Sequence, residues 1–208
     1  MKNDVVFRAY LTNLGAYNEG ELIGKWIDFP IQNDSLTLDE SIKKILAEIG
    51  VDGKKYEEYF ITDYDSEIDG LVGCFGEYEN IFLLNYLANK ILEMDCSTEQ
   101  FEAILELGEY TGSVMDLINL VCNTESFYFL PEVENDYDLG YEYAVNSGMF
   151  TTELQSIGTL ANYIDYESYG RDIRLTDGGI HTANGYITMT DKVTIYFDDT
   201  EDIPDLYN

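Results

Sequence analysis

The sequence predicts an α+β protein, built as an elongated chain of three small modules. Apolar and polar residues alternate in short stretches of the first and last modules, which is the pattern of strands. The middle of the chain instead carries apolar residues at helical spacing. Aromatic residues make up 14% of the chain and are spread along it, whereas acidic disordered segments lack them. We therefore expect folded modules at residues 1–66, 67–123 and 124–208.

The first module is predicted to combine a small antiparallel sheet with one helix. Strands are expected in "VVFRAYLTN" (5–13), "ELIGKWIDF" (21–29) and "YEEYFITDYD" (56–65). Thr37 and Glu40 have the capping-box spacing that opens a helix. An apolar stripe follows this box, so we expect the helix to pack against the sheet.

The middle module is predicted to be helical. The stretch "ENIFLLNYLANKILEMD" (79–95) is strongly apolar and long enough for a helix of several turns. Ser97 and Ser113 each stand at the N-cap position before an apolar stripe, so each is expected to open a further helix.

The last module is predicted to be α+β, with an acidic tail. It begins with the aromatic stretch "SFYFLP" at 126–131. The expected elements after it are helices near 137–147 and 152–166, strands in "RDIRLT" (171–176) and "GYITMT" (185–190), a further strand in "KVTIYF" (192–197), and the tail "DDTEDIPDLYN" (198–208). Asn184-Gly185 is a turn signal between the first two strands.

The chain is strongly acidic. Its 41 Asp and Glu face 11 Lys and Arg, a formal net charge of −30, and no cation occurs between Lys90 and Arg171. Such a surface repels nucleic acid and anionic lipid, so we expect neither direct nucleic-acid binding nor membrane attachment. The charge also opposes compact folding, and an elongated chain of modules lowers that self-repulsion. The excess charge is more than solubility needs, which indicates a basic partner.

The sequence indicates a cytoplasmic protein. The longest apolar run, "IFLL" at 81–84, is too short to span a bilayer, and no secretory signal pattern precedes the first module. Three widely separated cysteines are typical of reduced thiols rather than a disulfide framework.

Catalytic and cofactor motifs do not fit, so we expect a protein that is not an enzyme and has no cofactor. The single histidine, His181, lies in a predicted hairpin region and is interpreted as an exposed turn residue. The three cysteines carry no catalytic signature, and they are too far apart for a zinc site. Gly15 and Gly20 have the spacing of a phosphate loop, but Glu21 replaces the lysine that such a loop needs.

A calcium site in "DYDSEIDG" (63–70) remains an alternative. Taking Asp65 as the first position of an EF-hand loop places an acid at the fifth position and glycine at the sixth. Glu67 stands where Asp or Asn is preferred, and Gly76 stands where a bidentate Glu is required. We therefore predict no metal site, and a solvated strand edge is the favoured interpretation.

Tyrosines are interleaved with the acids. The 18 tyrosines include those in "YEEY", "DYD", "YEY" and "DYE". Most are expected in the core, but exposed rings beside carboxylates suit a surface that receives arginine and lysine side chains. That combination is the complement of a DNA-binding groove.

Three blocks of the sequence resemble the ArdA family of antirestriction proteins. They are "LTNLGAYNEGELIGKWIDFP" (11–30), "YFITDYD" (59–65) and "LANYIDYESYGRD" (160–172). The first and last patterns are long and specific, and the resemblance covers residues 7–188 in the family's order. The segment 191–208 extends past the family pattern.

The resemblance implies a DNA mimic carried by mobile genetic elements such as conjugative transposons. It implies a homodimer formed through the C-terminal module, and a partner that is a type I restriction-modification enzyme, whose DNA-binding groove the mimic occupies. No residue would then be catalytic. The acids expected to imitate phosphates are Glu19, Glu21, Glu106, Glu109, Asp116, Glu125, Glu132, Glu134, Asp136, Asp138, Glu142, Asp165 and Glu167.

Other residues of the matched blocks are expected to be structural. Trp26, Tyr163 and Ile164 are predicted to lie in the core, and Gly15, Gly20 and Gly170 to set turns. An alternative function is an acidic binding module for another basic DNA-binding protein, and a less favoured one is a calcium-binding carboxylate protein.

Overall fold

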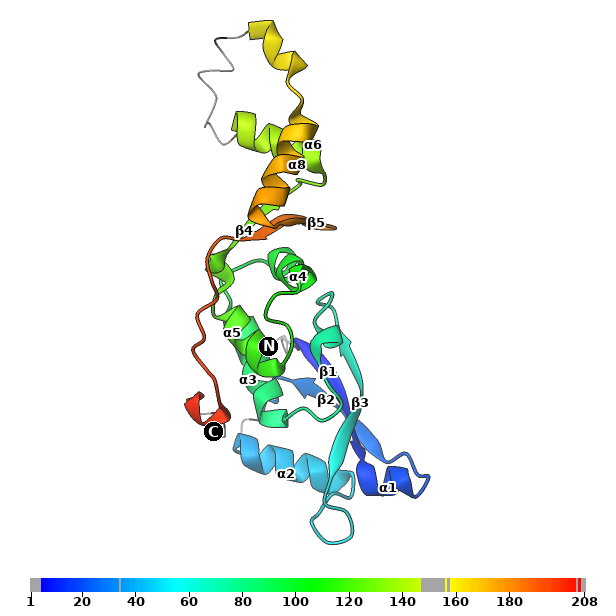
Figure 1. The fold of residues 1–208 in the computed structure, drawn as a ribbon. Helices are drawn as coiled ribbons and strands as arrows, with labels where there is room; N and C mark the ends of the chain where they lie inside the picture. Colours follow the sequence, from blue (N-terminus) through cyan, green and yellow to red (C-terminus); the bar gives the residue numbers. More distant parts are fainter. Residues whose placement is uncertain (1–4, 34, 147–155, 157, 205, 207–208) are drawn as a thin grey trace. The chain divides into compact units, whose positions relative to one another are not determined.

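The structure is a computed structural model that describes residues 5–33, 35–146, 156, 158–204 and 206. It has the α+β class that the sequence predicts, with two three-stranded antiparallel sheets and several helices (Figure 1). The chain divides into two compact units. Unit 1 comprises 1–95, 110–122 and 194–208, and unit 2 comprises 96–109 and 123–193. The units are therefore interleaved along the sequence, whereas the three predicted modules are consecutive.

The sheet of unit 1 has the order β2-β1-β3. Its strands are β1 (Phe7–Asn13), β2 (Gly24–Phe29) and β3 (Tyr59–Ser66), which confirms the three strands predicted in this region. The alternation of apolar residues along β1 places Phe7 and Leu11 on the inner face, where both are buried. Phe7 stacks on Phe29 across the β1–β2 ladder with the ring centroids 5.0 Å apart.

The first matched block forms the connection between β1 and β2. Its helix α1 (Leu14–Asn18) is capped by Asn13, whose side chain accepts the Ala16 N–H and donates to the Ile49 carbonyl. Gly15 lies inside α1, so its predicted role in a turn is wrong. A glycine fits there because a Cβ would come within 2.2 Å of the Tyr56 ring. Gly20 has φ +91° and sets the turn that the sequence predicts.

Unit 1 also contains α2 (Leu38–Glu48), α3 (Ile81–Glu93) and α5 (Val114–Val121). The predicted capping box is present in α2, and Ser113 caps α5 as expected. Helices α3 and α5 pack together and bury apolar stripes that include Leu84, Leu87 and Leu117.

The C-terminal segment returns to unit 1 and lies against α5. The Asn119 side chain accepts the N–H groups of Tyr196 and Phe197 and donates to the Phe197 carbonyl, at 2.8–3.0 Å. The Phe197 ring meets Tyr86 of α3 edge to face. The strand predicted at 192–197 is wrong, because these backbone groups bond to one side chain instead of a neighbouring strand. A short 3-10 helix, Thr200–Asp202, follows.

The sheet of unit 2 has the order β4-β6-β5, with β4 (Phe127–Pro131), β5 (Ile180–Thr182) and β6 (Gly185–Met189). The strand and turn predicted around Asn184-Gly185 are confirmed. Helix α4 (Thr98–Leu107), which Ser97 caps, packs on this sheet.

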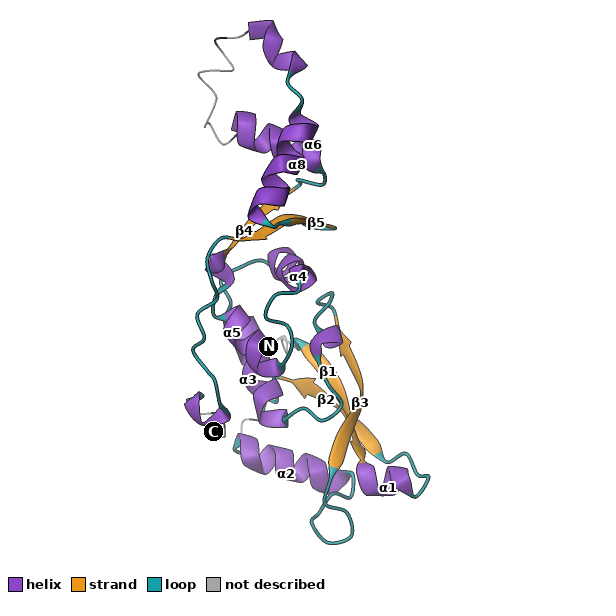
Figure 2. Ribbon diagram, in the orientation of Figure 1, coloured by secondary structure: helices purple, strands orange, loops and turns teal. Residues whose placement is uncertain are grey.

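Helices α6 (Asp136–Tyr141) and α8 (Tyr166–Asp177) pack closely side by side in unit 2 (Figure 2). A Cβ on Gly140 would lie 1.9 Å from the Tyr166 carbonyl oxygen, and one on Gly170 would lie 1.8 Å from that of Asp136. Gly170 of the last matched block is thus a helix-crossing residue, and its predicted role in a turn is wrong. The two glycines allow the backbones to approach.

The strand predicted at 171–176 is also wrong, because these residues belong to α8. Asp165 caps the start of α8, and Gly178 ends it in a left-handed conformation. Helix α6 continues into a π-helical turn, Glu142–Asn146, close to the predicted helix at 137–147. Residues 152–155 and 157 of the predicted helix at 152–166 lie outside the described residues, and within the described remainder Gly158–Tyr163 forms a 3-10 helix.

Candidate partner-binding surface

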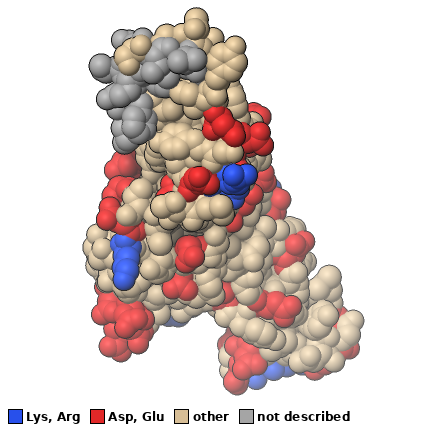
Figure 3. Space-filling view, turned by 45° about the horizontal axis from the view of Figure 1, so that its top comes forward, with Lys and Arg blue, Asp and Glu red and all other residues tan. Residues whose placement is uncertain are grey.

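Both units are strongly acidic. Unit 1 contains 25 acids and eight bases, a net charge of −17, and unit 2 contains 16 acids and three bases, a net charge of −13. The excess is therefore not confined to one end of the chain. Figure 3 shows acidic side chains spread over the viewed face, with few basic side chains among them.

The cations that form ion pairs leave most of the acids uncompensated. Six of the lysines and arginines in the described part of the chain pair with a carboxylate: Arg8 with Asp28, Lys25 with Glu48, Lys43 with Asp39, Lys55 with Glu19, Lys90 with Glu93, and Arg174 with Asp136. Exposed pairs contribute little to stability. These six ion pairs involve only six of the 41 acids.

Most of the predicted phosphate-mimicking acids lie on the surface. The exposed ones are Glu19, Glu21, Glu106, Glu109, Glu125, Glu132, Glu134, Asp165 and Glu167. The half-buried ones are Asp116, Asp136, Asp138 and Glu142. The exposed set has members in both units, with Glu19 and Glu21 in unit 1 and the others in unit 2.

Three of these acids also hold the starts of helices. Asp165 is the N-cap of α8 and accepts hydrogen bonds from the backbone and the side chain of Ser168. These bonds lower the pKa of Asp165. Asp116 accepts the Ser113 hydroxyl, and Asp138 accepts the Asn135 side chain, at the starts of α5 and α6. Carboxylates at these positions are stabilised by the helix dipole and keep a fixed orientation.

Asp136 differs from the exposed predicted acids because it is half-buried and is held by two side chains of neighbouring elements. Arg174 of α8 binds both of its carboxylate oxygens, at 2.7 and 3.0 Å, and His181 Nε2 lies 2.9 Å from Oδ1. The hydrogen bond from Arg174 is the main cause of the lowered pKa of Asp136. The cluster joins α6 to α8 and β5. The negative charge of Asp136 is balanced by the positive charge of Arg174. This arrangement indicates a structural role for Asp136.

His181 is not the exposed turn residue that the sequence suggests. It lies in β5, half-buried, with its ring held by Asp136 and packed against Tyr186 at a centroid distance of 5.3 Å. These contacts place no nucleophile beside the ring. Its other nitrogen, Nδ1, is buried without a hydrogen-bond partner in the described part of the chain.

One surface acid of the first matched block, Glu19, is held by side chains of the loop that precedes β3. Glu19 accepts a hydrogen bond from the Tyr56 hydroxyl at 2.7 Å and pairs with Lys55 at 3.3 Å. The bond from Tyr56 is the main cause of its lowered pKa. The Tyr56 ring in turn covers Gly15, so one tyrosine fixes both the glycine and the carboxylate of this block.

Two aromatic residues predicted to be buried are exposed. Trp26 is 43% exposed and Tyr163 is 84% exposed. In β2, Ile27 and Phe29 face the core, so the alternation of the strand turns Trp26 to the other face. That alternation was readable in the sequence, and it would have corrected the prediction for Trp26.

The stretch considered for calcium does not form an EF-hand. Asp63 and Asp65 lie in β3, and a 3-10 helix, Val72–Cys74, occupies the middle of the twelve-residue window. Among the residues that the structure describes, no group of three or more His, Cys, Asp or Glu side chains is placed to hold a metal ion. None of the described helices is long and apolar enough to cross a membrane.

The sequence model of a protein family described as "Antirestriction protein (ArdA)" matches residues 9–188. The chain belongs to the ArdA family. A search of curated proteins found no match to it. All of the predicted acids lie within the ArdA match, whereas the segment that Asn119 binds lies beyond it. The ArdA assignment makes the acidic surface, rather than a catalytic centre, the candidate functional site.

Proposed function

We propose that this chain is a DNA mimic that occupies the DNA-binding groove of a type I restriction-modification enzyme. By blocking that groove it would protect incoming mobile-element DNA from restriction. The observation that carries the proposal is the set of exposed carboxylates on both folded units, which few cations offset. Membership of an antirestriction family supports the same class of partner.

The amount of charge fits a long stretch of duplex. B-DNA carries one negative charge per about 1.7 Å of helix axis. The net charges of −17 and −13 then correspond to about 29 Å and about 22 Å of duplex. One chain would replace about 50 Å of DNA, and two chains about 100 Å, enough for a groove that reads a split site. Binding would be driven largely by release of the counterions that the partner's groove and the acids hold.

We propose further that the chain acts as a homodimer formed through the C-terminal module, residues 124–208. Exposed rings in this part supply the surface: Tyr128, Tyr137, Tyr141 and Tyr163 are all at least 40% exposed. A two-fold contact would present the same acidic face to both halves of a symmetric groove. Analytical ultracentrifugation that compares the wild type with Tyr163→Ala tests this contact. If the contact exists, the variant should contain a larger fraction of monomer than the wild type at the same concentration.

A plasmid-transfer assay tests the antirestriction function. Transfer into a restricting host should rise when the protein is expressed, while transfer into a matched non-restricting host stays unchanged. Glu132→Gln, Glu134→Gln and Glu167→Gln are suitable substitutions, because all three side chains are exposed. The triple variant should lose more protection than any single one, since the charge is distributed. Abolition of protection by one of these single substitutions in a folded protein would instead indicate a discrete site.

A further inference from the structure

The outer face of the unit 1 sheet combines exposed aromatic and acidic side chains in one shallow hollow. Trp26 and Asp28 of β2 and Asp63 and Asp65 of β3 line it, with Arg8 of β1 between them, and its volume is about 650 Å³. The register places Arg8 opposite both Asp28 and Asp65, and Tyr10 opposite both Trp26 and Asp63. We call these residues the Trp26 face.

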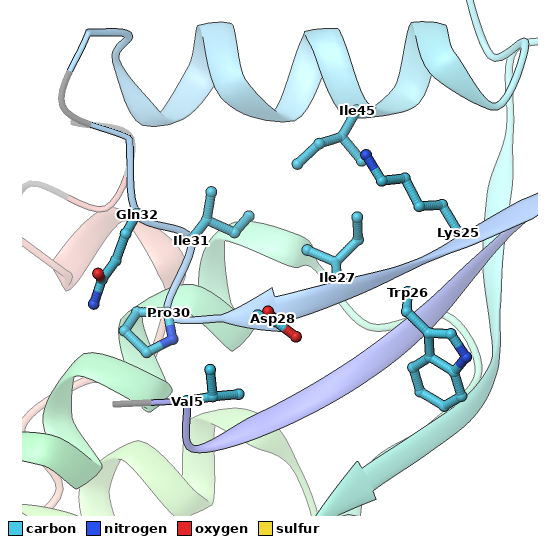
Figure 4. Close-up of a pocket in the computed structure, with 9 residues that line it drawn as sticks. All are labelled: Val5, Lys25, Trp26, Ile27, Asp28, Pro30, Ile31, Gln32 and Ile45. Carbon is cyan, nitrogen blue, oxygen red and sulfur yellow. The ribbon is translucent and has the colours of Figure 1, made fainter. Parts of the chain in front are cut away.

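The indole of Trp26 is held in place while part of its surface stays open. Tyr10 contacts it edge to face, with the ring centroids 5.4 Å apart. Gly24 makes room for this pair, because a Cβ there would come within 2.6 Å of the Tyr10 ring. Figure 4 shows Trp26 projecting away from Ile45 of α2, toward which Ile27 points. An exposed tryptophan on a rigid strand is a low-entropy anchor for binding.

The charge on the Trp26 face favours an incoming cation. Arg8 is already engaged, because its Nε lies 2.9 Å from Asp28 Oδ1. Asp63 and Asp65 are exposed, and neither has an ion-pair partner among the described residues. Three carboxylates and one guanidinium leave a net charge of −2 on the face. A phosphate would be repelled there, so nucleic acid is not the occupant.

We propose that the Trp26 face receives an arginine side chain of the basic partner. Arginine is the best match because its planar guanidinium can stack on the indole while its N–H groups reach a carboxylate. Lysine can satisfy the charge but cannot stack in the same way. This proposal deepens the proposed function, and rests on it, by adding a discrete aromatic contact to the distributed acids.

Direct binding can be followed by fluorescence, since Trp26 is the only tryptophan of the chain. The probes are a capped Gly-Arg-Gly-Arg-Gly peptide and its lysine counterpart. The arginine peptide should change the Trp26 emission saturably, and should bind about threefold or more tighter than the lysine peptide. Equal responses to the two peptides would overturn the proposal, because charge alone would then explain the binding.

A charge-matched pair of variants locates the contact. Asp63→Asn with Asp65→Asn should weaken binding of the arginine peptide by about fivefold or more. Glu57→Gln with Glu58→Gln removes the same charge from exposed positions before β3, and should leave binding within about twofold of the wild type. Equal losses in the two double variants would show a general electrostatic effect and contradict the proposal.

The contribution to the partner complex is tested in the full-length chain. Trp26→Ala should weaken inhibition of the restriction enzyme by about 3- to 30-fold, the range of one cation–π contact. Trp26→Phe keeps a ring at this position and should lose less. If both variants inhibit like the wild type, the Trp26 face is not part of the contact, while the proposed function stands. If the wild type does not inhibit at all but binds the arginine peptide selectively, the proposed function fails and the arginine site remains.

Discussion

Replacing Asn119 should release the C-terminal segment from unit 1. The side chain is 1% exposed, and it makes three hydrogen bonds at 2.8–3.0 Å to Tyr196 and Phe197. Each such bond contributes about 0.5–1.5 kcal/mol net, so Asn119→Ala should cost about 1.5–4.5 kcal/mol of unfolding free energy. The loss is capped by the free energy with which the segment docks, because the released backbone groups can bond to water.

That cap can be measured with a truncated chain. Removing residues 194–208 should cost at least as much as Asn119→Ala, and Asn119→Ala in the truncated chain should cost much less than in the full-length chain. Asn85→Ala is the matched control, since Asn85 is also buried but accepts the Ile31 N–H instead. Its cost should be similar in both backgrounds. Urea unfolding followed by Trp26 emission reports on unit 1.

The reasoning would be refuted if Asn119→Ala cost the same in the full-length and truncated chains. The Asn119 side chain would then stabilise α5 by itself, through its bond to the Met115 carbonyl, and not by holding the segment. The C-terminal extension would have no part in the stability of unit 1.

Three further predictions concern stability. Gly170→Ala should destabilise unit 2 by about 3 kcal/mol or more in thermal unfolding, because the added Cβ would meet the backbone of α6. Gly73→Ala is the control and should be close to neutral, because a Cβ added there has no other heavy atom within 4 Å. Asp136→Asn should cost about 1–3 kcal/mol at pH 7 in urea unfolding, and Glu134→Gln should cost far less. Because the pKa of Asp136 is lowered in the folded state, its contribution is fully present above the unfolded pKa of about 4. It is lost progressively as the pH falls from there toward the lower folded pKa, so the Asp136→Asn difference should shrink in acid. Raising NaCl from about 20 to about 300 mM should raise the melting temperature of the wild type, since screening relieves the repulsion at a net charge of −30; a fall would contradict this.

The sequence predicted the elements whose signals are local. Strand β2 and the first part of β1 follow a two-residue alternation, and helices α4 and α5 begin at the expected cap residues. The errors have physical causes. In α8, Ile173 and Leu175 alternate as in a strand, but Leu175 is exposed and Tyr166, Gly170 and Ile173 form the packed side of a helix.

The candidate surface was predictable in composition but not in detail. Charge counts identify an acidic protein, and most of the predicted acids are exposed. The pairing of Asp136 with Arg174 joins residues 38 positions apart, which spacing cannot show. The role of Gly170 likewise depends on the approach of α6. Trp26 was the avoidable error, because the positions of Ile27 and Phe29 already place it on the outer face.

Competition between this chain and DNA for one enzyme is the most direct test of DNA mimicry. A fluorescently labelled duplex bound to a purified type I restriction-modification enzyme is titrated with the chain, at several salt concentrations. DNA mimicry predicts full displacement of the duplex, with an affinity for the chain that falls steeply as salt rises. A ternary complex in which the enzyme holds the duplex and the chain together, or binding that is insensitive to salt, would contradict it.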